Sequence, residues 1–113
     1  KYISNLYDDY IKENKIDLSR PSSCNQNFVY NYSYYPVLFS SEEALLKVRS
    51  KLIEEGINTR RYFYPSLNQL PYVNGEICIN SEEVSLRVLC LPIYADLASE
   101  EVLKVLKIIR GNL

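Results

Sequence analysis

Histidine, tryptophan and methionine are all absent from this sequence of 113 residues, and the missing histidine is the most informative. Without it, a Ser/His or Cys/His catalytic pair cannot form. The three cysteines, Cys24, Cys78 and Cys90, are widely spaced and form no C-x-x-C pattern, so no zinc or other metal site is expected. An odd number of unclustered thiols indicates free cysteines in a reducing compartment and predicts a cytoplasmic protein.

A strong net charge is also missing. The 13 basic and 14 acidic residues give a formal charge of −1, which argues against nucleic acid or a membrane surface as partner, because either favours a basic excess. No apolar run approaches the roughly 20 residues of a membrane span. The sequence starts at Lys1, inside an amphipathic pattern and without an initiator methionine, which favours a fragment of a longer protein.

Four segments have apolar residues at the three- and four-residue spacing of a helix. They are residues 1–14, 41–55, 81–87 and the segment from Ser99 onward. Ser40 and Glu43 fit a capping box at the start of the second helix. Gly56 stands where a left-handed C-terminal cap would end that helix.

Three segments are predicted as strands, namely residues 28–39, 57–64 and 88–93. Pro36 cannot donate a ladder hydrogen bond, which places it at an edge or a bulge. With 47% hydrophobic residues, the chain is expected to form one α+β domain, a two-layer small domain with a three-stranded sheet and flanking helices. One face of this sheet would be covered, and the other would be exposed or belong to a partner.

The segment Gly56–Tyr72, GINTRRYFYPSLNQLPY, concentrates the groups that bind polar ligands. Two adjacent arginines, Arg60 and Arg61, precede the aromatic run Tyr62–Tyr64. This pattern has two interpretations. It is typical of a strand with aromatic residues on both faces, and it also suits one wall of a binding site.

Several motifs resemble one known family, and they occur in its order along the chain. They are Tyr32–Phe39 (YSYYPVLF), Gly56–Pro65 (GINTRRYFYP), Pro71-Tyr72, Arg87–Tyr94 (RVLCLPIY) and Ser99–Val102 (SEEV). This set resembles the C-terminal domain of the DegT/DnrJ/EryC1/StrS aminotransferases, which act on sugar nucleotides with pyridoxal 5'-phosphate. The resemblance covers essentially all of residues 1–113.

The resemblance implies that residues 1–113 are the C-terminal small domain of an aminotransferase, similar to that of fold-type I enzymes. The N-terminal domain that holds pyridoxal 5'-phosphate and the Schiff-base lysine would then be absent from this chain. We therefore expect no catalytic residue, no bound cofactor and no activity in this chain alone. The parent is expected to be a homodimer that moves an amino group from glutamate to a keto sugar nucleotide, for surface polysaccharide or antibiotic sugar synthesis.

The same resemblance implies three substrate-binding residues. Tyr62 matches the position that contacts the sugar nucleotide, and Phe63 lies beside it. Arg60 is expected to pair with a phosphate or with the carboxylate of the amino donor, although Arg61 is an alternative. Many members have a histidine two residues after the proline of this motif, where this chain has Leu67.

Other interpretations need no parent enzyme. The chain would then be a free-standing, non-catalytic α+β domain that binds a partner or a small ligand. A standalone hydrolase is not expected, because the paired glutamates of this chain lie in first helical turns, where the helix dipole accounts for them. Arg87 is expected to pair with Glu82 or Glu83 rather than with a ligand.

Overall fold

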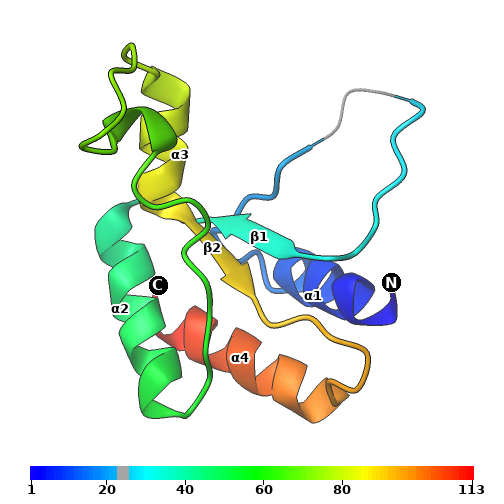
Figure 1. Cartoon of the computed structure of the whole chain (residues 1–113). Helices are drawn as coiled ribbons and strands as arrows, with labels where there is room; N and C mark the ends of the chain where they lie inside the picture. The colour runs from blue at the N-terminus through cyan, green and yellow to red at the C-terminus, as the bar shows by residue number, and fades with distance from the viewer. Residues whose placement is uncertain (23–25) are drawn as a thin grey trace.

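The structure is a computed structural model that describes residues 1–22 and 26–113. It contains four α-helices, a 3-10 helix and two strands (Figure 1), namely α1 (Tyr2–Glu13), β1 (Tyr35–Leu38), α2 (Glu42–Glu54), η1 (Leu67–Gln69), α3 (Ile79–Arg87), β2 (Val88–Leu91) and α4 (Ser99–Gly111). The predicted α+β class and the four predicted helices are therefore confirmed. Cys24 lies outside the described residues.

The sheet of the described residues has two antiparallel strands, not the expected three. Tyr35 of β1 lies opposite Leu91 of β2, and Leu38 lies opposite Val88. The predicted strand over 57–64 is wrong, because only Arg60 forms a bridge, with Cys90. The backbone leaves the extended conformation soon afterwards, since Phe63 has a φ of 48° in the left-handed region.

The predicted strand over 28–39 is also too long, because β1 begins only at Tyr35. Tyr32 has a φ of 57°, which no continuous strand accommodates. Nearby, the Ser33 amide donates to Asn31 Oδ1 at 3.0 Å, so a local side-chain turn replaces the ladder. At the start of α2, Ser41 rather than the predicted Ser40 is the N-cap and accepts from the Ala44 amide at 3.1 Å.

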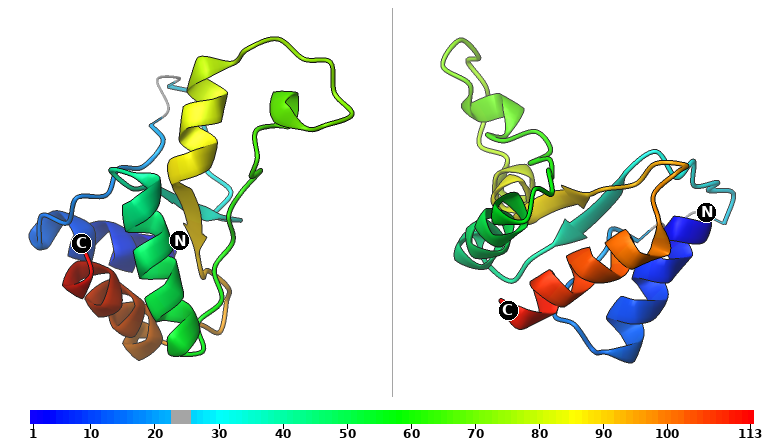
Figure 2. Two further views of the ribbon diagram at one scale, coloured as in Figure 1. Left: turned by 90° about the vertical axis from the view of Figure 1, so that its left-hand side faces the viewer. Right: turned by 90° about the horizontal axis from the view of Figure 1, so that it is seen from below.

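The core lies between one face of the sheet and the apolar faces of three helices. Figure 2 shows α1 and α4 side by side beneath the sheet, and α2 packs against α4. The fully buried side chains of the core include Tyr7, Tyr35, Phe39, Leu45, Leu52, Leu89, Leu106 and Ile109. Burial of each aliphatic side chain of this size contributes about 1.5–3 kcal/mol, so the helix periodicity supplies most of the stabilising contacts.

One polar cluster ties α1 to β1 at the edge of this core. The Tyr35 hydroxyl donates to Asp8 Oδ1 at 2.7 Å, and Arg20 donates to the same oxygen at 2.8 Å. The Arg20 guanidinium also lies 4.0 Å from the centre of the Tyr35 ring. Burial, followed by the nearby Asp8 carboxylate, raises the pKa of Tyr35 above its usual range, so this phenol stays a neutral donor.

Residues 66–87, here called the arm, project away from this core. The arm comprises η1, a loop and α3, and Figures 1 and 2 show it extending beyond the body of the domain. Arg87 anchors its end, since it pairs with Glu83 at 3.2 Å, as predicted, and donates to the Phe39 carbonyl at 3.1 Å. Leu67, Ile77 and other apolar side chains of the arm are exposed.

Gly56 ends α2 with the left-handed cap that the sequence predicts. Its φ is 74°, its amide donates to the Ile53 carbonyl, and the Ile57 amide donates to the Leu52 carbonyl at 2.8 Å. These two hydrogen bonds form a Schellman motif.

We expect Gly56→Ala to lower the free energy of unfolding by about 1 kcal/mol, because alanine disfavours a positive φ. No atom lies within 4 Å of an added Cβ, so a steric clash does not explain such a loss. Gly111→Ala is the matched control, since this site is also open but has no positive φ. Urea unfolding midpoints test this, and equal midpoints for the two variants would contradict it.

Candidate functional site

A cavity of about 440 Å³ lies at the base of the arm, and we call it the arm cavity. It is lined by Tyr62, Phe63, Ser66, Leu67, Asn68, Cys78, Ser81, Val84, Ser85 and Val88. The structure therefore brings two of the three predicted site residues, Tyr62 and Phe63, to one cavity. None of the lining side chains carries a formal charge, so the arm cavity suits neutral groups.

The aromatic wall of the arm cavity is made by Tyr62 and Phe63. Their ring centres are 4.2 Å apart, and the Tyr62 ring also lies 5.3 Å from that of Tyr34. Tyr62 is 37% exposed and Phe63 58% exposed, so the rings remain open to a ligand. The left-handed backbone of Phe63 costs about 1–3 kcal/mol, so the surrounding contacts must hold it in place.

The polar wall is made by a short hydroxyl and amide network. Ser66 Oγ donates to Asn68 Oδ1 at 2.7 Å and lies 2.6 Å from Ser81 Oγ. Since the Ser66 proton is used, Ser81 is the donor in the second contact. Asn68 in turn donates to Glu82 Oε1 at 3.1 Å and to the Glu76 carbonyl at 3.0 Å.

The sequence alone did not predict this network, because the network joins Ser66 and Asn68 to Ser81 of α3 across a loop. The available signal was Gly75, where an added Cβ would lie 3.0 Å from the Asn68 side chain. Glycine suits this close approach of the loop to Asn68, because a Cβ at this position would force Asn68 to shift.

The two adjacent arginines have different environments. Arg60 exchanges backbone hydrogen bonds with Cys90, at 3.3 and 2.8 Å, and its guanidinium is exposed with no ion pair to the described residues. Arg61 is only 12% exposed and pairs with Glu42 at 2.9 Å. Arg60 is therefore the arginine available to an anion, although it does not line the arm cavity.

The two described cysteines are both free, as predicted, but their environments differ. Cys90 is 5% exposed and is a small core residue, and burial raises the pKa of its thiol, while nearby Arg60 partly lowers it. Cys78 is exposed on the arm and lines the arm cavity. Among residues 1–22 and 26–113, no group of histidine, cysteine or acidic residues is arranged to hold a metal ion.

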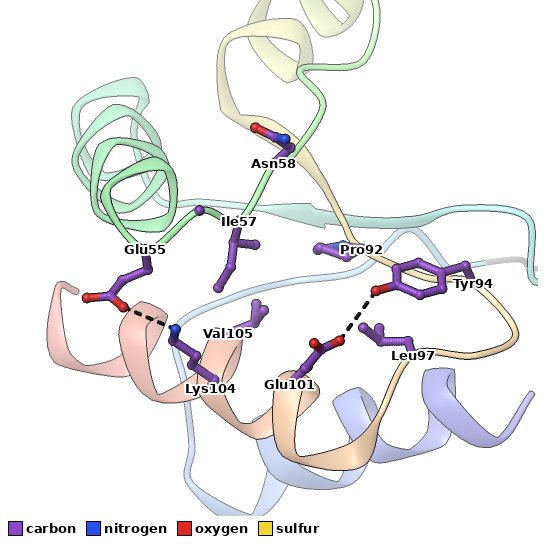
Figure 3. Close-up of a pocket in the computed structure, with 10 residues that line it drawn as sticks. Glu55, Ile57, Asn58, Pro92, Tyr94, Leu97, Glu101, Lys104 and Val105 are labelled. Carbon is purple, nitrogen blue, oxygen red and sulfur yellow. Dashed lines mark hydrogen bonds and ion pairs between the residues drawn. The ribbon is translucent and has the colours of Figure 1, made fainter.

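A second hollow of about 340 Å³ lies between the end of α2 and α4 (Figure 3). Each of its charged side chains has a partner within the hollow. Lys104 lies 3.1 Å from Glu55, and the Tyr94 hydroxyl donates to Glu101 at 3.3 Å. Because Glu55, Glu101 and Lys104 are already engaged in this way, the hollow is a weaker candidate.

The lysines of this chain do not suit pyridoxal phosphate. All seven are exposed, and two of them, Lys51 and Lys104, form ion pairs with glutamates. A lysine that forms a Schiff base needs a desolvated or electropositive site that lowers its pKa. None of the seven lysines lies in such a setting.

Comparison with known proteins identifies the family. Residues 1–110 match the DegT/DnrJ/EryC1/StrS aminotransferase family, so the chain belongs to that family. It is 31% identical over 121 aligned residues to the dTDP-4-amino-4,6-dideoxy-D-glucose transaminase of Escherichia coli, in an alignment that covers 100% of this chain. The same alignment covers 32% of that relative, so the chain spans about a third of its length.

Solved structures agree with the fold. The aminotransferase TlmJ from Streptoalloteichus hindustanus superposes with a TM-score of 0.80 at 18% identity, over 97% of this chain and 30% of that protein. DesI, solved in the presence of its TDP-sugar product, also gives 0.80, at 20% identity over 97% of this chain and 29% of its own. In the described part of the chain, no helix has the length and apolarity needed to cross a membrane.

We expect the thiols to react in the order of their exposure. In a Cys24→Ser background at about pH 8, a chromogenic disulfide reagent should modify Cys78 quickly and Cys90 only on unfolding, because the latter thiol is buried and less ionised. Adding Cys78→Ser should abolish the fast phase. A fast phase that survives this second substitution would show that Cys90 is accessible.

Proposed function

We propose that this chain is the C-terminal small domain of a pyridoxal-phosphate-dependent aminotransferase that acts on a sugar nucleotide. The observation that carries the proposal is the family match over residues 1–110, with a dTDP-sugar transaminase among the relatives. The arm cavity supports it, because a half-exposed aromatic pair beside uncharged hydroxyl and amide groups suits a sugar ring.

The reaction we propose moves an amino group from glutamate to a 4-keto or 3-keto sugar nucleotide in the cytoplasm. Pyridoxal phosphate, when bound, carries the amino group between the two substrates. Since all seven lysines of this chain are exposed, the N-terminal remainder of the parent would hold the cofactor. We further propose a homodimeric parent whose amino sugar enters surface polysaccharide or an antibiotic sugar.

Within this scheme the chain shapes and closes the sugar site. The ring of Tyr62 would pack on the apolar face of the pyranose while its hydroxyl bonds a polar substituent, and Phe63 would exclude water. Arg60 would pair with a phosphate of the nucleotide. Leu67 cannot form the hydrogen bond that a histidine makes at its position, so it would only contact the sugar.

The alternative of a free-standing binding domain is less well supported. Leu67, Ile77 and Ile79 expose large apolar side chains along the arm. Such a surface favours contact with further protein, as a domain cut from a longer chain would require. The same surface predicts that the chain self-associates when it is isolated.

We expect the full-length protein to aminate a keto sugar nucleotide with glutamate and to bind pyridoxal phosphate. The 113-residue chain should do neither, because it has no suitable lysine. Visible absorbance spectra and product analysis by mass spectrometry measure both properties. An open reading frame that starts near Lys1, or cofactor bound covalently to the short chain, would contradict the proposal.

Two substitutions of Tyr62 separate the contribution of its ring to substrate binding from that of its hydroxyl. In the full-length enzyme, Tyr62→Ala should raise KM for the sugar nucleotide about tenfold, because one aromatic contact with the sugar is lost. Tyr62→Phe should keep most of that binding. Cofactor loading should be unchanged in both.

Tyr72→Ala is the matched control, because Tyr72 is an exposed tyrosine of the arm that does not line the arm cavity. Steady-state kinetics against each substrate measure these effects. Unchanged KM in Tyr62→Ala would make Tyr62 a packing residue.

A further inference from the structure

The aromatic wall of the arm cavity lacks the support that a sheet would give it. Between α2 and η1, the only backbone link to the sheet of the described residues is the bridge between Arg60 and Cys90. Tyr62 and Phe63 follow this bridge and are not hydrogen-bonded into a ladder. Because Phe63 also has a left-handed φ, another contact must hold these two side chains in place.

The side chain of Arg61, the residue before Tyr62, makes several contacts beside this segment. Its Nη2 lies 2.9 Å from Glu42 Oε1 and donates to the Leu86 carbonyl at 3.2 Å. Its guanidinium carbon lies 3.6 Å from the centre of the Tyr64 ring. We call Arg61 with Glu42, Leu86 and Tyr64 the Arg61 clamp.

The clamp uses the two helix ends that meet beside this segment. Glu42 is the first residue of α2, and Leu86 lies in the last turn of α3, where carbonyls have no partner within the helix. A guanidinium suits this place, because it neutralises a carboxylate and satisfies a free carbonyl with separate N–H groups. Its flat face then stacks on the Tyr64 ring, which a lysine cannot reproduce.

Burial shows that Arg61 is not open to a ligand. Its side chain is 12% exposed, against 34% for Glu42, and its Nε atom is buried. Arg60, one residue earlier, is exposed and has no ion pair to the described residues. The two adjacent arginines therefore have different roles.

We propose that Arg61 is a positioning residue, which holds Tyr62 and Phe63 against the arm cavity through Glu42, the Leu86 carbonyl and Tyr64. It does so without touching the substrate. The effect of this role on substrate binding rests on the proposed function, whereas its effect on the order of the segment does not.

The first test measures that order in the full-length protein. Arg61→Lys and Glu42→Gln both break the clamp, and Arg110→Lys is the control, because Arg110 is an exposed arginine of α4 that contacts Asn14. In both clamp variants, amide hydrogen exchange in a peptide spanning residues 60–66 should be faster by about tenfold, as expected for one lost charged hydrogen bond. Exchange in α4 should be unchanged. Unchanged exchange in residues 60–66 would overturn the inference.

The second test measures substrate binding in the same variants. Arg61→Lys and Glu42→Gln should each raise KM for the sugar nucleotide severalfold, with kcat and the KM for glutamate within about twofold of the parent. The double variant should be no worse than the more affected single variant, because both changes break one clamp. If Arg61 bound the phosphate directly, Glu42→Gln would leave KM unchanged, and that result would overturn the inference.

The two tests separate this inference from the proposed function. A full-length protein without sugar-nucleotide aminotransferase activity would refute the proposed function, and the exchange experiment would still decide whether the clamp orders residues 60–66. An active enzyme whose Arg61→Lys variant keeps slow exchange would refute the clamp alone. Faster exchange without a change in KM would refute the role of the clamp in substrate binding.

Discussion

The pairing of β1 with β2 is the contact on which the rest of this domain depends. It joins segments about 50 residues apart and places Leu38 opposite Val88. Since α2 begins soon after β1 and α3 ends where β2 begins, this register brings the start of one helix beside the end of the other. Both arginine contacts at that junction follow from it, namely Arg87 with the Phe39 carbonyl and Arg61 with Glu42.

How far the sequence predicts this fold depends on whether local or distant contacts decide each element. The helices and the cap at Gly56 were predicted, because periodicity and backbone chirality act within a few residues. The predicted strand over 57–64 was wrong, because aromatic residues favour a strand only where a neighbouring strand accepts them. Here Phe63 turns into the left-handed region, and a side-chain clamp replaces the ladder.

The candidate site also has residues that the sequence could predict and residues that it could not. Tyr62 and Phe63 are adjacent in one motif, so the sequence alone could predict that they lie on the same wall of a cavity. The network of Ser66, Asn68 and Ser81 could not, because it forms only when the loop folds back over Asn68. The choice between Arg60 and Arg61 also required the structure. Both are arginines and they are adjacent in the sequence, but Arg60 is exposed and Arg61 is nearly buried.

The exposed arm and the exposed lysines both indicate that this domain contributes a surface to a site rather than a reactive group. An enzyme site needs a reactive group in a desolvated setting, and the arm cavity offers an open aromatic wall with no charged side chain. In the proposed function, such a wall would contact a neutral ring and shield it from water. The wall can contact a ligand only if its two rings are held in position. The contacts that fix Tyr62 and Phe63 therefore matter as much as the two rings themselves. A clamp built on two helix ends meets this need, because α2 packs on the core and α3 runs directly into β2, so both ends move less than the loop that they hold.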